Sequence, residues 1–307
     1  MENIKGILVS IVAPMDNHIA NGGEKLLGNA SSIKRRNDGK VYISGQMQRH
    51  VLFSALDRIN LTDSGKENTY VSNGDGISNA IEVDLRADMG GFMHPSAGSY
   101  SGRRTAPLSV TPAVAKKASE ITRDLLVRLK VNEIDGSREQ ALATKEMSDS
   151  DLMIMNFFLD ITTLSITKIF RYKGEFHVNT EYIKHVNEKE RKRRVKLFLE
   201  ATRSMTDFAN QARNAVSGEP QKVLIVFDSK LSRKASRYFE AEQKEKSNLI
   251  AELDERESIY FIGDDTAGEK SVNAAYKDAF TTLEKSILFD PCNGDDNIKK
   301  FNEIVFK

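Results

Sequence analysis

The sequence predicts an α+β or mixed α/β fold, because short apolar runs of strand length alternate with longer runs of helical spacing. With 307 residues, of which 39% are hydrophobic, the chain can bury the core of one elaborated domain or of two. Its formal net charge is only +1. A uniformly basic coat for nonspecific nucleic-acid binding is therefore disfavoured, and a local patch on a near-neutral body fits a specific partner better.

A first strand is predicted at residues 6–14, where a β-branched apolar run is stopped by Pro14. The run is too short to span a membrane and lacks a cleavage pattern. We therefore expect no signal peptide, no membrane contact and a cytoplasmic protein. The single cysteine, Cys292, excludes disulfides and cysteine-based zinc sites.

Residues 31–58 are notably basic, with six basic and two acidic side chains. A tight turn at residues 37–39 and a short strand at 41–43 lead to a helix predicted at residues 45–60, for which Ser44 is a natural N-cap. The free amides and the dipole at such a helix start favour an anion. A basic loop beside this helix start fits the phosphate backbone of a nucleic acid. The polar side chains concerned are Lys34, Arg35 and Arg36 in the loop, and Gln46, Arg49 and His50 on one flank of the helix.

Two segments after this helix are predicted to be irregular. Residues 61–79 are rich in Ser, Asn, Asp and Gly, which is typical of an exposed loop or insertion. Residues 94–112 contain several prolines and glycines and are expected to form a loop that closes over something. Arg103 and Arg104 in this loop are well placed to contact phosphates, because a guanidinium forms paired hydrogen bonds to them.

A projecting arm, in the form of a long hairpin, is predicted in the middle of the chain. Residues 127–131 alternate like a strand with one face in water, and residues 153–161 have the composition of a returning strand. The polar residues 133–151 between them would form a mobile tip. The alternative is one continuous helix over residues 112–130, which helix propensity alone favours.

The second half of the chain is predicted to alternate helices and strands. Helical spacing over residues 186–216 predicts a helix, which is ended by Gly218 and Pro220. Within it, the cationic run at 189–196 is expected to form a solvated face, with contact to RNA as the less favoured alternative. The remaining predicted elements are a strand at 223–227, a solvated helix at 232–256, a strand at 259–262 and an amphipathic helix at 271–287.

No motif in the sequence predicts a metal site, a cofactor or a catalytic group. The glycine-bearing loop after the first strand lacks the Gly-Lys-Ser/Thr of a P-loop and does not match a dinucleotide fingerprint. Three carboxylates, Glu82, Asp84 and Asp88, are close in sequence, but Arg86 lies among them. Ion pairing and helix capping are therefore favoured over metal binding, and we expect no cofactor.

Three blocks occur in a specific order within residues 4–116: KRR…VYISGQMQRHVLFSAL, DLRADMGGFM and SGRRTAPLSVTPAVA. This succession resembles the Cas-seven family in its DevR-like branch, the backbone subunits of type I CRISPR surveillance complexes (Cascade), and most resembles type I-B. The resemblance implies one domain over residues 1–307, built on a modified RRM (ferredoxin-like) sheet called the palm. It also implies a helical fingers region, residues 61–116, and a projecting thumb hairpin, residues 125–160.

The resemblance implies a non-catalytic protein that binds crRNA mainly through the RNA backbone and stacks on copies of itself along the strand. The thumb of one copy would fold over the RNA on its neighbour, and the exposed bases would pair with target DNA. Other Cascade subunits would be further partners. Carried over to this sequence, Ser44, Gln46 and Arg49 would contact phosphates, and Lys34, Arg35 and Arg36 would line the same groove.

One departure from the RRM pattern limits the way in which RNA would be recognised. The sequence has no paired Phe/Tyr strand signature, so we expect recognition of the RNA backbone in place of stacking on bases. The alternative function is that of the type III relatives, which cut target RNA with a loop aspartate. Asp16 and Asp38 lie in suitable loops, although a tight turn also selects an Asp between Asn and Gly.

Overall fold

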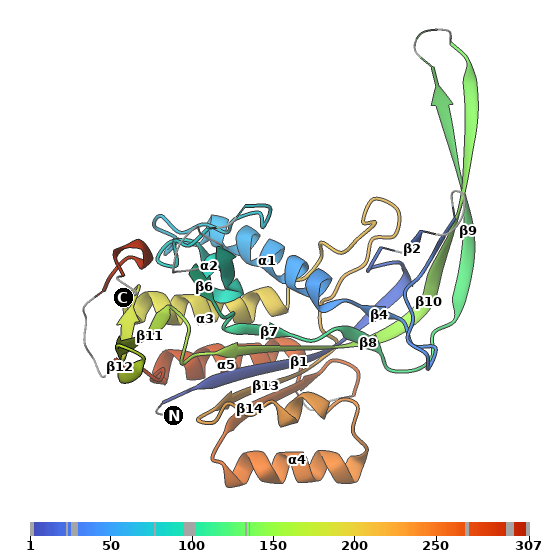
Figure 1. Ribbon diagram of the computed structural model, residues 1–307. Coiled ribbons are helices and arrows are strands. Elements are labelled where there is room, and N and C mark those ends of the chain that lie inside the picture. The colour runs from blue at the N-terminus through green and yellow to red at the C-terminus, as the bar shows by residue number, and fades with distance from the viewer. Residues whose placement is uncertain are drawn as a thin grey trace.

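Ten of the strands in the computed structural model form one mainly antiparallel sheet with the order β14-β13-β1-β10-β3-β2, and β4, β7, β8 and β9 pair beside this path (Figure 1). The structure describes residues 3–22, 24–25, 30–76, 78–94, 102–132, 134, 136–267, 270–292 and 298–304. The strands of the sheet are β1 (Gly6–His18), β2 (Glu24–Lys25), β3 (Ala30–Ser32), β4 (Tyr42–Ile43), β7 (Leu108–Val110), β8 (Ala113–Ala115), β9 (Ile121–Val131), β10 (Arg138–Asp160), β13 (Lys222–Asp228) and β14 (Ile259–Asp264).

The remaining elements cover or extend this sheet. Two short hairpins stand apart from it, β5 (Phe92–His94) with β6 (Gly102–Arg104) and β11 (Ile166–Lys173) with β12 (Phe176–Lys184). The helices are α1 (Gly45–Thr62), α2 (Leu85–Gly90), α3 (Glu188–Thr202), α4 (Gln243–Glu255) and α5 (Val272–Lys285), with short 3-10 turns η1 (Lys234–Arg237) and η2 (Phe301–Glu303). This is the α+β architecture that the sequence predicts.

Alternating residues of β1 feed the two apolar layers on either side of the sheet. Ile7, Val9 and Ile11 belong to the larger core, which α1, α3 and α5 cover. Leu8 and Val12 point to the smaller core under α4 and η1. Because successive side chains of a strand point to opposite faces, a run with no polar alternation is what a strand buried on both faces requires.

The first strand does not stop at Pro14 as predicted, because β1 continues to His18. Pairing with β13 ends at Val12, whereas pairing with β10 continues past Pro14. From that point one edge of β1 has no partner strand. The missing N–H of a proline is tolerated at such an edge, since no ladder hydrogen bond is lost there.

Strands β9 and β10 form a long hairpin that projects beyond the body of the protein (Figure 1). The hairpin excludes the alternative helix over residues 112–130. The predicted mobile tip is also wrong, since β10 begins at Arg138 and runs as one strand of 23 residues into the central sheet. Whether this hairpin acts as a thumb, and whether residues 61–116 act as fingers, stay predictions.

The helix predicted at residues 186–216 is too long, because α3 ends at Thr202. The apolar side chains beyond it, Met205, Phe208 and Val216, are buried all the same, but by an irregular segment. Gly218 closes that segment by donating its N–H to the Met205 carbonyl. Burial of apolar residues at helical spacing therefore does not require a helix. The predicted helix at residues 232–256 is likewise shorter and is preceded by η1.

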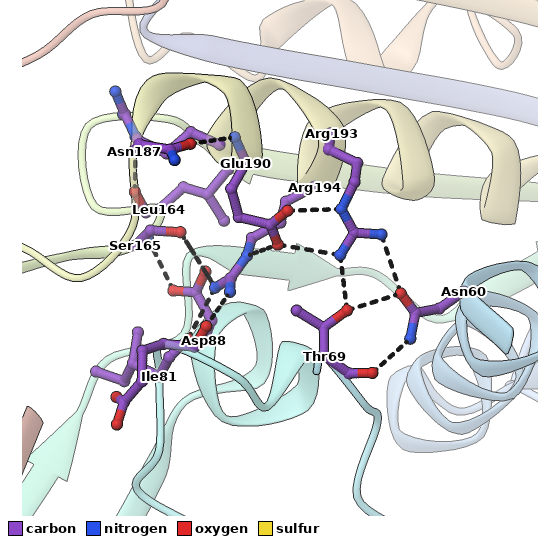
Figure 2. A network of polar contacts seen from close by, with 12 residues as sticks. Asn60, Thr69, Ile81, Asp88, Leu164, Ser165, Asn187, Glu190, Arg193 and Arg194 are labelled. Atoms are coloured by element: carbon purple, nitrogen blue, oxygen red, sulfur yellow. Dashed lines mark hydrogen bonds and ion pairs between the residues drawn. The ribbon is translucent and has the colours of Figure 1, made fainter. Parts of the chain in front are cut away.

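A buried ion-pair network joins α2 to α3 (Figure 2). The carboxylate of Asp88 accepts hydrogen bonds from Arg194 at 2.7 Å, from Arg104 at 2.6 Å and from the hydroxyl of Ser165 at 2.6 Å. Glu190 bridges Arg194 to the neighbouring Arg193 on the same helix. The side chains of Asp88 and Arg194 are fully buried.

This network contradicts the solvated face predicted for residues 189–196. Arg191 is also fully buried, and its guanidinium donates to the carbonyls of Leu164, Ile161 and Phe289. The cationic run is therefore partly a set of structural arginines that satisfy buried carbonyls and carboxylates. Buried polar groups need such partners, because an unpaired one is strongly destabilising.

Burial lowers the pKa of His185 to about 4. Its Nδ1 donates to the Lys299 carbonyl at 2.7 Å, so its Nε2 accepts from the Thr167 hydroxyl at 2.7 Å and the ring is neutral. The unfolded chain takes up a proton near pH 6.5, whereas the folded chain does so only near pH 4. The free energy of unfolding should therefore fall by about 2 kcal/mol between pH 7 and pH 5. Urea unfolding across this range measures the effect, and His185→Gln should remove this part of the pH dependence. An unchanged slope in the variant would contradict the assignment.

Candidate nucleic-acid interface

The start of α1 has the geometry predicted for it. Ser44 is the N-cap, and its Oγ accepts from the Met47 N–H at 3.2 Å. The Ser44 N–H donates to the Asn21 side chain at 3.1 Å, which fixes the entry of the chain into the helix. A Cβ on Gly45 would lie 3.2 Å from the Val110 carbonyl, so the glycine lets the helix start lie close against β7.

A cavity of about 600 Å³ lies against this helix start. Its wall on the α1 side consists of Gly45, Gln46, Arg49 and His50, and Arg86 of α2 contributes a second cation. The other lining residues are Asn73, Gly74 and Asp75 of the loop before α2, and Leu108 and Val110 of β7.

Arg49 and Arg86 both stack on Phe53, with guanidinium carbons 5.6 and 4.7 Å from the ring centroid. Burial lowers the pKa of both arginines, and the charge of Arg49 lowers that of Arg86 further. Among the described residues, neither guanidinium forms a salt bridge, although Asp84, Asp57 and Asp75 lie near enough to Arg86 to favour its charge. Cations held in this way are available to an anion in the cavity.

The two arginines differ in how many of their N–H groups donate hydrogen bonds within the protein. Arg49 donates to the Gly90 carbonyl. The Nε of Arg86 is buried and has no hydrogen-bond partner within the part of the chain that the structure describes. The hydrogen-bonding capacity of Arg86 is therefore less fully satisfied within the protein than that of a buried guanidinium usually is.

The structure places the other predicted contact residues in three different settings. Gln46 is exposed at the cavity. Arg35 and Arg36 are exposed and Lys34 is half-buried, but they belong to the turn before β4 and do not line the cavity. Arg103 lies in β6, and its side chain is outside what the structure describes.

Arg104 is a correction to the predicted contact set. Its side chain is only 6% exposed. Besides Asp88, its guanidinium donates to the carbonyls of Thr163 and Ile166, at 2.7 and 2.9 Å. A guanidinium in this environment holds the fold together and does not face a phosphate, so we remove Arg104 from the RNA-binding residues.

Sequence reasoning missed Arg86 as a site residue. The sequence favours ion pairing of Arg86 with the neighbouring carboxylates, but Asp84 caps α2 and Asp88 pairs with distant arginines. Once both carboxylates are engaged elsewhere, Arg86 is left to the cavity. The signal in the sequence is the two-residue spacing between Asp84 and Arg86. If Asp84 caps the helix, Arg86 lies in the first helical turn.

Both candidate catalytic aspartates have hydrogen-bond partners, but Asp16 lies in β1 and not in the loop predicted for it. Asp16 accepts from the Ser150 hydroxyl at 2.6 Å, and Asp38 accepts from the Lys40 N–H at 3.2 Å within its turn. In the described ranges, no three His, Cys, Asp or Glu side chains are grouped as metal ligands. No helix of the described residues is both long and apolar enough to cross a lipid bilayer.

The mainly antiparallel sheet with its covering helices is an α+β fold of the RRM type, as the sequence resemblance implied. Residues 27–217, more than half of the chain, match the family described as "CRISPR-associated negative auto-regulator DevR/Csa2". The chain belongs to this family, the DevR-like branch of the Cas-seven proteins.

Solved structures support the fold at low sequence identity. One similar chain, described as "CRISPR RNA-guided surveillance complex", has a TM-score of 0.52 and 15% identity, over 90% of this chain and 99% of that one. Another, described as "CRISPR RNA-guided surveillance complex, pre-nicking", has a TM-score of 0.50 and 12% identity, over 91% and 99%. No curated protein matches. The I-B subtype stays a prediction.

Proposed function

We propose that this protein is a non-catalytic backbone subunit of a type I Cascade complex that binds crRNA and presents it to target DNA. The observation that carries the proposal is the pair of half-buried arginines, Arg49 and Arg86, at the start of α1 in a member of the DevR/Csa2 family. Guanidinium groups bind phosphate oxygens in pairs and do not depend on base identity. A guide-binding subunit needs this property, because the guide sequence varies while base pairing supplies specificity.

The projecting β9–β10 hairpin supports the proposal that copies of the chain stack along the RNA. As a thumb, residues 125–160 would lie over the RNA bound to the neighbouring copy. Residues 61–116, which contain α2 and Arg86, would form the fingers region, and residues 1–307 would act as one domain. Other Cascade subunits and the target DNA would be bound through this assembly. Lys34, Arg35 and Arg36 on the adjacent turn would extend the contact with the RNA backbone.

Purification of the protein after coexpression with a CRISPR array tests this function. The protein should carry a discrete small RNA and elute far above its own 34.4 kDa in size-exclusion chromatography. The complex should dissociate as the salt concentration rises, because bound phosphates release counterions. Elution as an RNA-free monomer would contradict the proposal. Regularly spaced cuts in complementary RNA with Mg²⁺, lost in Asp16→Ala or Asp38→Ala, would contradict its non-catalytic part.

A further inference from the structure

We propose that the outer face of the β11–β12 hairpin is a second binding site, which holds single-stranded nucleic acid by stacking bases on exposed aromatic rings. This site is separate from the proposed crRNA contact at α1. The hairpin lies at the opposite end of the protein from the β9–β10 arm (Figure 1). None of the residues of this face lines the α1 cavity.

The aromatic side chains of this hairpin are exposed although its other face is buried. Phe170, Tyr172 and Tyr182 are 50%, 59% and 40% exposed. In contrast, Ile169 and Ile183 pack into a small core with Phe301 and Ile81. The fold of the hairpin therefore depends on its inner face, and the rings on the outer face are not needed for the core.

The strand register brings the outer side chains into one row. Tyr182 pairs with Lys168, and a bulge between Arg171 and Tyr172 places His177 opposite Tyr172. The His177 ring then lies 5.8 Å from the rings of both Phe170 and Tyr172, in edge-to-face contacts at 68° and 77°. A row of exposed aromatic rings offers surfaces on which bases can stack, whatever their sequence.

The charge on this face is complementary to a phosphate backbone. The ammonium group of Lys168 lies 5.0 Å from the Phe170 ring and 5.9 Å from the Tyr182 ring. Glu181 belongs to the other face of the hairpin, where it pairs with Arg171 at 2.8 Å. The Lys168 cation beside exposed rings, with Glu181 on the other face, favours nucleic acid over an apolar protein surface.

A cavity of about 380 Å³ continues the face at the base of the hairpin. Tyr182, Phe289 and Leu231 form apolar walls, and Lys168 and Lys5 line it as well. The Lys5 ammonium lies 4.7 Å from the Phe289 ring. The apolar walls of this cavity suit a nucleic-acid base, and the two ammonium groups suit the phosphate attached to that nucleotide.

This site differs from the mode of recognition predicted from the sequence. The sequence has no paired Phe/Tyr strand signature of the RRM type. In the structure, exposed rings lie instead on a separate two-stranded sheet. Stacking does not distinguish deoxyribose from ribose, so DNA and RNA strands share the chemistry and have to be compared directly.

The sequence contains no tryptophan, which allows a direct fluorescence test. In the full chain, Phe170→Trp should give an emission that is quenched by single-stranded (dT)20 or (rU)20, with the two titrations showing which sugar binds more tightly. Phe176→Trp is the matched control, because Phe176 is 80% exposed near the turn but pairs with Lys173 on the opposite face. Both proteins should also carry Arg49→Ala and Arg86→Ala, which weaken any binding at α1. The test of the hairpin is then independent of whether the α1 cavity binds RNA.

Alanine variants in the same background measure the strength of the site. Tyr172→Ala and Tyr182→Ala should each weaken binding about tenfold, and Lys168→Ala should make binding less dependent on salt. Quenching equal to that of the Phe176→Trp control, or unchanged affinity in the alanine variants, would overturn the proposal. If these variants changed only self-association, the face would be a protein contact and the proposal would be wrong.

Discussion

Asp88→Ala is expected to lower the free energy of unfolding by about 3–5 kcal/mol, because it leaves buried Arg104 without its carboxylate and buried Arg194 with Glu190 alone. The carboxylate is fully buried and accepts from Arg104, Arg194 and both the N–H and the hydroxyl of Ser165. Burial by itself would raise the pKa of Asp88, but the two arginines outweigh it and the pKa lies below its ordinary value. The pair therefore stabilises the fold at neutral pH, and this contribution is lost only as acid protonates the carboxylate.

Urea unfolding of wild type and variant at pH 7 measures this prediction. Asp207→Ala is the matched control, since Asp207 pairs with Arg58 at the surface and both side chains are more than 40% exposed. It should change the free energy by at most about 1 kcal/mol. If Asp88→Ala does not fold, Asp88→Asn keeps the shape of the side chain and removes only its charge. A loss as small as that of Asp207→Ala in a folded Asp88 variant would contradict the role assigned to the network.

Reversal of the two cavity charges is expected to have the largest effect on RNA binding. The double variant Arg49→Glu, Arg86→Glu should weaken binding of single-stranded RNA at least a hundredfold at low salt, because two attractive contacts become repulsive. Replacement of both arginines with alanine should weaken binding less. It should also reduce the slope of log K against log salt by roughly 0.7 for each lost phosphate contact. Fluorescence anisotropy over a salt series measures both quantities.

Arg58→Ala is the matched control for these variants, since it removes an arginine from the same helix whose guanidinium is paired with Asp207. It should leave the affinity and the slope nearly unchanged. Because Arg49 and Arg86 also stack on Phe53, the stability of each variant has to be measured in parallel. Folded double variants that bind RNA as the wild type does would show that the cavity is not the phosphate site.

The sequence predicts those features that depend on neighbours along the chain. Ser44 caps α1 through a contact three residues away, and short apolar runs identify β13 and β14 correctly. Arg194 meets its carboxylate across 106 residues, so nothing in its surroundings in the sequence distinguishes it from a solvated cation. The same holds for Arg86, whose availability depends on where two nearby aspartates find their partners. Side-chain roles set by tertiary contacts are therefore where the sequence-based interpretation failed.

The unbroken course of β10 has a mechanical consequence. Its ladders with β9 and with β1 meet at Ser148, which pairs with Ile121 on one side and with His18 on the other. Beside this junction, buried Asp151 accepts from His18 at 2.7 Å and from Ser119 at 2.6 Å. No break in β10 separates the hairpin from the central sheet. A force on the end of the hairpin would therefore be transmitted directly to the centre of the protein.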